Sequence, residues 1–159
     1  MQDFIFKQLY DETFSVIGYI GDDAEAVIPP VHWGHPVTLI GDDVFRRHTE
    51  ITSVRIPDTV RDIGGFVFDG CTGLRHIELP AGLENLWQYA FVRSSIEEII
   101  LPHGVRQIIP YTFKDCRNLH TFVCNEGLKK ICAHAFEGCT QLRDFHCGND
   151  TEISPQAFE

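Results

Sequence analysis

Phenylalanine recurs along the chain at a nearly constant interval. The steps between six successive members of the series are 23, 23, 22, 23 and 22 residues, and the members are Phe45, Phe68, Phe91, Phe113, Phe136 and Phe158. A fixed period of about 20–29 residues is the signature of a stacked repeat, because a single repeat is too short to bury its own apolar face. This period constrains the fold more than any other feature of the sequence.

Other positions also keep their residue type when they are counted from the same phenylalanines. An aliphatic residue stands six positions later, at Ile51, Leu74, Leu119 and Leu142, with Ile96 displaced by a one-residue deletion. A further apolar residue follows three positions on, at Val54, Ile77, Ile99, Phe122 and Phe145. Proline closes three of these segments, at Pro57, Pro80 and Pro102. Alternating apolar residues that end at a proline predict a short strand with one buried face.

A turn and a second apolar pair complete each repeat. Glycine or asparagine permits the turn in the segments AGL, HGV and NEGL, and a pair such as Leu83 and Leu86 follows it. Stacked rungs of this kind bury each other's faces and build one continuous core. We therefore expect a mainly β or α/β solenoid, a right-handed superhelix with one short parallel strand on each rung.

The repeat resembles that of a known family. The pattern LxxIxLPxxLxxIgxxAFxxCxxL is similar to the BspA-like leucine-rich repeat, a bacterial subtype with proline after the strand and cysteine where other subtypes use asparagine. The residues that match include Leu74, Ile77, Leu79, Pro80, Leu83, Leu86, Ala90 and Phe91, and then Leu119, Leu128, Ile131, Ala135, Phe136 and Cys139. The resemblance covers roughly residues 25–159. It implies surface-exposed recognition proteins, some of them adhesins to host matrix proteins, and it supplies no catalytic residues.

The two ends of the chain depart from the repeat. We expect residues 1–24 to form an N-terminal hairpin cap, in which Phe4–Tyr10 and Phe14–Ile20 are joined by a turn at Asp11–Thr13. Residues 25–159 then form the solenoid of about six rungs, the first irregular and the last truncated. Because the sequence stops one residue after Phe158, either the native chain continues or a partner or a second copy covers this open C-terminal edge.

An insertion, VHWGHP, interrupts the irregular first rung. We expect it to be a loop in which Trp33 serves as an aromatic plug. The three-residue spacing of His32 and His35 is also compatible with metal ligation, although the sequence offers no third ligand.

Five of the six cysteines follow the columns of the repeat. Cys71, Cys116 and Cys139 stand three positions after a phenylalanine, and Cys124 and Cys147 replace the last inward residue of a strand. We interpret all five as structural thiols, and we expect the S–H groups of the first column to reach a loop carbonyl. Because adjacent rungs lie ~4.8 Å apart, Cys116–Cys139 or Cys124–Cys147 could instead approach disulfide distance. No C-x-x-C motif points to zinc.

The composition and the missing motifs exclude several functions. A formal charge of −10 disfavours nucleic acid and anionic membranes as partners. No run approaches the ~18 apolar residues of a membrane span, and no signal peptide precedes the repeats. The expected location is therefore cytoplasmic by default, or the cell surface or exterior if a leader was removed. No G-x-S-x-G, P-loop or H-E-x-x-H motif is present, so we expect neither an enzyme nor a cofactor.

A partner would contact the outward positions of the strands. The candidate partner-binding face consists of Arg55, His76, Glu78, Glu98, Ile100, Thr121, Val123 and His146. Solenoids bind along such extended faces, although outward β-branched residues also satisfy intrinsic strand preference. The sequence favours a non-enzymatic module that recognises a protein or peptide, with cell-surface adhesion as one form of it. The alternative is a structural or self-assembling fragment that associates through its open C-terminal edge.

A column of aromatic residues stands two positions before the phenylalanines. Its members are Phe66, Tyr89, Tyr111 and His134. We expect their rings to stack and close one side of the solenoid, with the tyrosine hydroxyls in water.

Overall fold

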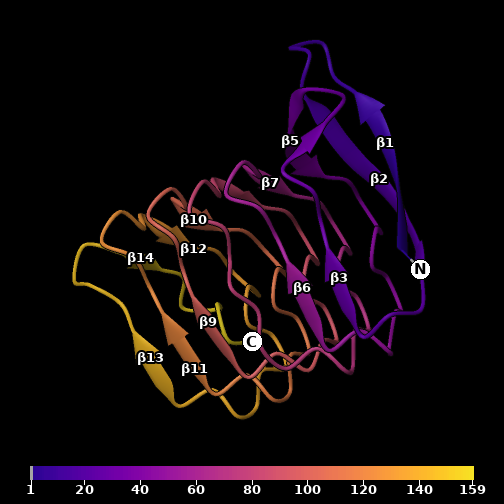
Figure 1. The fold of residues 1–159 in the computed structure, drawn as a ribbon. Coiled ribbons are helices and arrows are strands. Elements are labelled where there is room, and N and C mark those ends of the chain that lie inside the picture. Colours follow the sequence, from indigo (N-terminus) through magenta and orange to yellow (C-terminus); the bar gives the residue numbers. More distant parts are fainter. Residues whose placement is uncertain (1) are drawn as a thin grey trace.

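Segments one repeat apart in the sequence lie side by side in a computed structural model, which describes residues 2–159 (Figure 1). Residues 2–159 contain strands and turns but no helix. The strands are β1 (Gln2–Gln8), β2 (Phe14–Gly21), β3 (Glu25–Val27), β4 (Val31–His32), β5 (His35–Ile40), β6 (Ser53–Arg55), β7 (Asp62–Ile63), β8 (Asn85–Leu86), β9 (Glu98–Ile100), β10 (Gln107–Ile108), β11 (Thr121–Val123), β12 (Lys130–Ile131), β13 (Asp144–His146) and β14 (Glu152–Ile153). The mainly β solenoid predicted from the sequence is confirmed.

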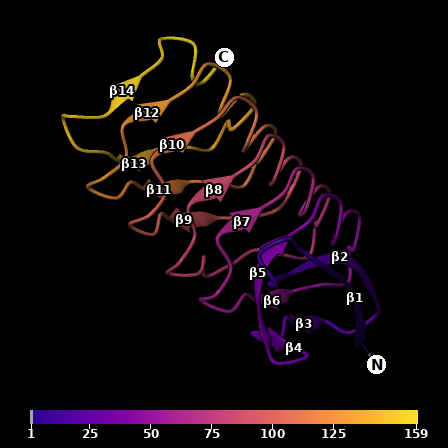
Figure 2. The same cartoon turned by 90° about the horizontal axis from the view of Figure 1, so that it is seen from above.

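Two series of short parallel strands run along the stack (Figure 2). The first series follows the predicted strand segments and includes β9, β11 and β13, where Phe122 pairs with Ile99 on one side and with Phe145 on the other. The second series arises from the apolar pair after the proline turn and includes β10, β12 and β14. The sequence predicted only one strand per rung, so the second series is an addition to that expectation.

One predicted strand of the first series does not form. The segment His76–Glu78 has no strand assignment, although it carries the same column pattern as its neighbours. The first series is therefore divided into the pair β3–β6 and the group β9–β11–β13. This rung still carries one parallel strand, β8, which belongs to the second series.

The phenylalanine column forms the centre of the core. Successive rings stack with centroids 4.9–5.8 Å apart and planes within 19° of parallel. The backbone at the same corner is an unbroken ladder, because each of these phenylalanine N–H groups from Phe45 to Phe136 donates to a carbonyl of the next rung at 2.8–3.0 Å. Each buried ring contributes about 1.5–3 kcal/mol by burial, and each stacked pair adds about 0.5–1.5 kcal/mol.

The first two strands form the predicted hairpin. β1 and β2 pair antiparallel with Phe4 opposite Tyr19, and the turn is fixed by Thr13, whose N–H donates to Asp11 Oδ1 at 3.1 Å. β2 continues the second series by pairing in parallel with β5. The hairpin packs its aromatic residues on the first rung, since Phe4 lies 6.4 Å from Phe45 between ring centroids. The domain boundary at residue 24 stays a prediction.

The insertion is a β-ribbon, not the loop expected from the sequence. β4 pairs antiparallel with β5, and Trp33 and Gly34 form the two-residue turn with φ angles of 49° and 81°. Positive φ at both central positions matches the right-handed twist of a hairpin, and glycine tolerates it at little cost. Trp33 is 83% exposed and plugs nothing. His32 instead stacks on Phe6, with ring centroids 3.9 Å apart.

Cysteine thiols form a second column inside the rungs. The Sγ atoms of Cys71, Cys116 and Cys139 each lie 3.0 Å from the carbonyl oxygen of a phenylalanine on the preceding rung. This geometry confirms the predicted thiol–carbonyl contact for these three residues. Burial raises the pKa of the Cys71 thiol to about 12, so the proton that makes the hydrogen bond is retained at neutral pH.

The other cysteine column is oxidised. Cys124 and Cys147 form a disulfide, with their Cα atoms 4.9 Å apart on adjacent rungs. The structural-thiol interpretation is therefore wrong for this pair, and of the two disulfides that the sequence left open, only this one forms, since Cys116 and Cys139 are free.

The aromatic column two positions before the repeat phenylalanines stacks as predicted. Phe66, Tyr89, Tyr111 and His134 have neighbouring ring centroids 4.8–5.4 Å apart and planes within 11° of parallel. All four adopt positive φ angles of 59–66°, a conformation that is uncommon for bulky residues. The stack holds this repeated turn in place along the solenoid.

Replacing Phe91 by alanine should lower the free energy of unfolding by about 3–5 kcal/mol, because it removes a fully buried ring and leaves a cavity between two others. Urea denaturation measures the change. The control is Tyr10→Ala, which removes a fully exposed ring and should change stability by less than about 0.5 kcal/mol. Equal effects of the two substitutions would contradict the stacked core.

The cysteines should differ sharply in reactivity. At pH 8 iodoacetamide should leave Cys71 unmodified in the native protein, because its pKa of about 12 keeps the thiol protonated and burial shields it. Half-buried Cys132 should react first, and Cys124 and Cys147 should react only after reduction. Peptide mass mapping measures each site, and native labelling of Cys71 as fast as Cys132 would contradict this arrangement.

Candidate functional site

A hollow of about 1060 Å³ lies on the strand face of three consecutive rungs. We call it the strand-face hollow. It is lined by Ser53–Asp58 from the first rung, by His76–Ala81 from the second, and by Glu98 and Ile100–His103 from the third. Its position coincides with the rung on which the predicted strand is missing.

Main-chain hydrogen bonds show how neighbouring rungs normally close this face. Beside β11, the His120 N–H donates to the Glu97 carbonyl at 2.9 Å where the strand begins. Where the strand ends, the Leu101 N–H donates to the Val123 carbonyl at 3.0 Å. The same two bonds recur between β11 and β13 and between β3 and β6. A closed junction between rungs therefore has one bond at each end of the strand.

The middle rung of the hollow lacks most of these bonds. One bond remains at its start, from the Glu97 N–H to the Arg75 carbonyl at 2.9 Å. Among residues 2–159, no main-chain or side-chain group pairs with the N–H or C=O groups of His76–Leu79. His76 and Glu78 are exposed and Ile77 is half-buried, so solvent or a ligand can reach this segment. The hollow therefore contains a row of backbone donors and acceptors that are free to bind a ligand.

The predicted face is divided by the structure. Arg55, His76, Glu78, Glu98 and Ile100 line the strand-face hollow. Ile100, the last residue of β9, is 60% exposed and presents an apolar side chain to the hollow.

The remaining three predicted residues lie on neighbouring strands. Thr121 and Val123 belong to β11 and His146 to β13, and none of them lines the hollow. The structure thus brings together five of the eight residues.

The charges around the hollow are unbalanced. The Arg55 guanidinium is paired with Glu25, with Nε and Oε1 2.7 Å apart. In contrast, Glu78 and Glu98 have no ion-pair partner within the described part of the chain. Asp58 adds a third carboxylate, which accepts only the Ala81 N–H at 3.0 Å. The rim of the hollow is consequently acidic.

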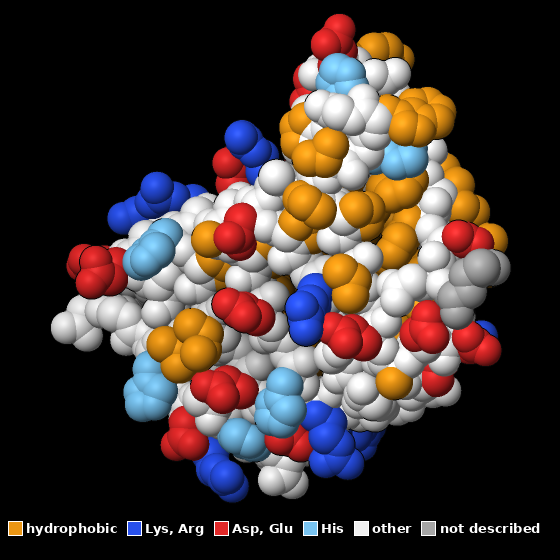
Figure 3. All heavy atoms as spheres, viewed as in Figure 1, with side chains coloured by type: hydrophobic (Ala, Val, Ile, Leu, Met, Phe, Trp, Pro, Cys, Tyr) orange, Lys and Arg blue, Asp and Glu red, His pale blue; other side chains and the backbone are white. Residues whose placement is uncertain are grey.

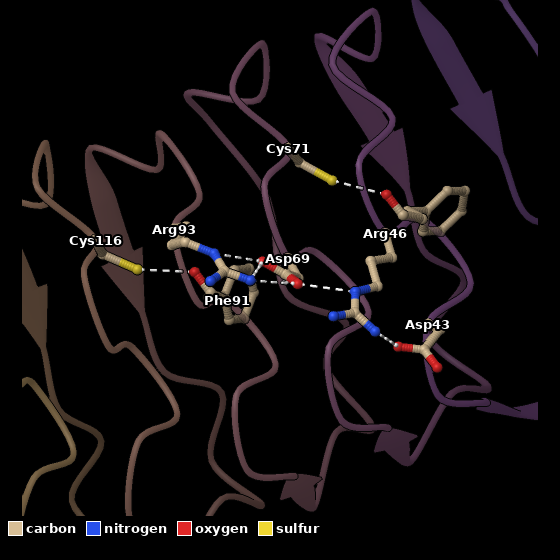
Figure 4. A network of polar contacts seen from close by, with 8 residues as sticks. Asp43, Arg46, Asp69, Cys71, Phe91, Arg93 and Cys116 are labelled. Atoms are coloured by element: carbon tan, nitrogen blue, oxygen red, sulfur yellow. Dashed lines mark hydrogen bonds and ion pairs between the residues drawn. The ribbon is translucent and has the colours of Figure 1, made fainter.

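A buried carboxylate elsewhere on the stack is fully engaged in structure (Figure 4). Asp69 is 1% exposed and lies between two arginines of adjacent rungs. Arg46 Nε reaches Oδ2 at 2.9 Å, and Arg93 forms a bidentate contact at 2.8–3.0 Å. Arg46 also contacts Asp43 at 3.2 Å. Because every lone pair of Asp69 faces an arginine, this cluster clamps three rungs together.

Hydrophobic side chains gather on the N-terminal end of the molecule, above β2 and β5 (Figure 3). The sequence pattern predicted no apolar surface patch here. The exposed ones include Tyr10, Ile17, Ile20, Val31 and Trp33. The sequence does contain an indication of this exposure. A Trp-Gly pair between two segments suited to strands is compatible with a two-residue hairpin turn, and the first residue of such a turn is exposed.

No three His, Cys, Asp or Glu side chains of residues 2–159 are arranged to hold a metal ion. The described chain also contains no helix long and apolar enough to cross a bilayer.

The stacked rungs define a leucine-rich repeat solenoid. The sequence matches the model of the BspA type leucine rich repeat region over residues 38–159, in six copies. The chain belongs to this family, as its repeat pattern predicted. No curated protein matches the chain by sequence.

Solved structures of bacterial leucine-rich repeat proteins share the fold. The leucine-rich repeat protein of T. pallidum is 27% identical with a TM-score of 0.83, over 90% of this chain and 78% of that one. A leucine-rich repeat protein of Bacteroides ovatus is 24% identical with a TM-score of 0.70, over 98% of this chain and 49% of that one. A leucine rich cell surface protein of Faecalibacterium prausnitzii is 24% identical with a TM-score of 0.65, over 89% and 52%. The chain spans about half the length of the last two.

Asp69→Asn should lower the free energy of unfolding by about 1.5–3 kcal/mol, because it removes the charge that two arginines bind in a buried site. Urea denaturation checks this value. Asp43→Asn is the matched control, because Asp43 is exposed and contacts only Arg46, and it should cost less than about 0.5 kcal/mol. If the two variants are equally stable, the buried clamp is not what holds these rungs.

Proposed function

We propose that this protein acts by binding a peptide, or a peptide-like segment of another protein, in the strand-face hollow. The observation that carries the proposal is a hollow across three rungs that combines exposed Ile100 with unpaired main-chain groups of His76–Leu79. An apolar contact and a few fixed polar groups are what a recognition site requires.

The type of fold supports binding without catalysis. On the strand face, side chains of adjacent rungs project in parallel, so the charged groups there stand in rows and do not converge on one reacting atom. Leucine-rich repeat proteins commonly bind along such faces. The proposed binding includes adhesion to a host matrix protein, which the family resemblance implies.

Self-association is the second candidate function. It is favoured by the apolar outer side of the cap hairpin, where Ile17 and Ile20 are exposed. Such patches are often contact sites between proteins. Sedimentation velocity at rising concentration separates the two functions, because self-association through this patch should be lost in Ile20→Glu and retained in Ile100→Glu.

A displayed library of random linear peptides tests the main proposal. Peptides selected on the native protein should bind Ile100→Glu at least about tenfold more weakly, because the substitution places a charge in the apolar centre of the contact. Ile20→Glu is the matched control, since Ile20 is equally apolar and exposed but lies on the cap, and its affinity should stay within about twofold.

Two further measurements complete this experiment. Thermal unfolding confirms that both variants fold like the native protein, and Val123→Glu asks whether the contact extends to β11 beyond the hollow. Peptides that bind native protein and Ile100→Glu equally well would refute the hollow as the binding site.

A further inference from the structure

We infer that the partner is an extended segment in which lysine or arginine alternates with apolar residues, and that its main chain hydrogen-bonds with His76–Leu79. This inference rests on the proposed function and specifies the chemistry of the ligand. It follows from three features of the strand-face hollow: its unpaired backbone, its acidic rim and its apolar floor.

The unpaired backbone favours an extended ligand. An extended peptide presents N–H and C=O groups along its whole length, and peptides commonly bind proteins by adding their main chain to a strand with free edges. The three prolines of the hollow, Pro57, Pro80 and Pro102, have no N–H to offer. The donors available to a ligand along the middle rung are therefore those of His76–Leu79.

The rim selects the charge of the ligand. Glu78 and Glu98 have no cationic partner within residues 2–159, whereas the one arginine of the hollow, Arg55, is paired with Glu25. Two unpaired carboxylates and the overall charge of −10 attract a cationic segment and repel an acidic one. Nucleic acid and anionic lipid fail the same criterion, because both carry the charge that the rim repels.

The apolar floor of the hollow favours a particular spacing of apolar side chains in the ligand. Ile56 and Ile77 are half-buried, so the floor offers apolar contacts on two successive rungs, and the exposed Ile100 adds an apolar side chain on the third. Successive side chains of an extended peptide point to opposite sides. A repeat of one basic and one apolar residue therefore satisfies the rim and the floor together.

Fluorescence anisotropy with defined peptides tests this inference. The probe is a labelled peptide of four Lys-Val repeats, and the comparison peptide has four Glu-Val repeats. We expect the Lys-Val peptide to bind at least about tenfold more tightly, and its affinity to fall with added salt because rim charges are screened. Methylating alternate backbone nitrogens of the Lys-Val peptide should weaken binding further, because it removes the ligand's hydrogen-bond donors.

Charge variants assign the effect to the rim. The double variant Glu78→Gln with Glu98→Gln should bind the Lys-Val peptide about five- to twentyfold more weakly, since each exposed ion pair is worth only a modest amount. Glu126→Gln with Glu152→Gln removes the same number of charges from exposed positions outside the strand-face hollow. This control should retain native affinity within about twofold.

The outcomes separate the inference from the proposed function. If library peptides depend on Ile100 but carry no basic residues, the proposed function stands and this inference is wrong. If the Lys-Val peptide binds equally well to both double variants, its binding is general electrostatic attraction and the inference is also wrong. If methylation leaves the affinity unchanged, the main-chain part of the inference fails.

Discussion

Everything in this structure depends on the stacking of one rung on the next at the phenylalanine corner. There the rings are in contact along the whole solenoid, and the backbone hydrogen bonds beside them form an unbroken series. Because this corner and the second series of strands join the rungs to one another, the opposite face does not need to be fully hydrogen-bonded. The stack tolerates a junction at His76–Leu79 where the strand ladder is open, and that tolerance is what leaves main-chain groups available for a ligand.

Most of the architecture could be predicted from the sequence, because the repeat places the same residue type at the same height on every rung. The phenylalanine column, the thiol column and the aromatic column at Phe66 all follow from counting. The oxidation state of each cysteine column could not be predicted in this way. Adjacent rungs bring both Cys116–Cys139 and Cys124–Cys147 within reach, but only Cys124–Cys147 is a disulfide. The repeat period determines which cysteines of one column lie close together on adjacent rungs, but it does not determine whether they form a disulfide.

The open junction could not be predicted for a related reason. Ile77, Leu79 and Pro80 fit the same pattern as the rungs that do form strands, so residue type gives no warning. A small displacement between rungs decides whether a hydrogen bond forms, and local patterns do not encode such displacements. Of the eight residues of the predicted face, Thr121, Val123 and His146 lie beside the strand-face hollow, on β11 and β13, where the strand ladder is closed.

The most direct test of this account is amide hydrogen exchange, measured residue by residue in the free protein. The account predicts that the amides of Ile77–Leu79 exchange much faster than Leu101 and Cys124, whose N–H groups bond across closed junctions at 2.8–3.0 Å. Protection of Ile77–Leu79 equal to that of Leu101 and Cys124 would mean that the strand ladder is continuous, and it would contradict the open junction on which the proposed binding site depends.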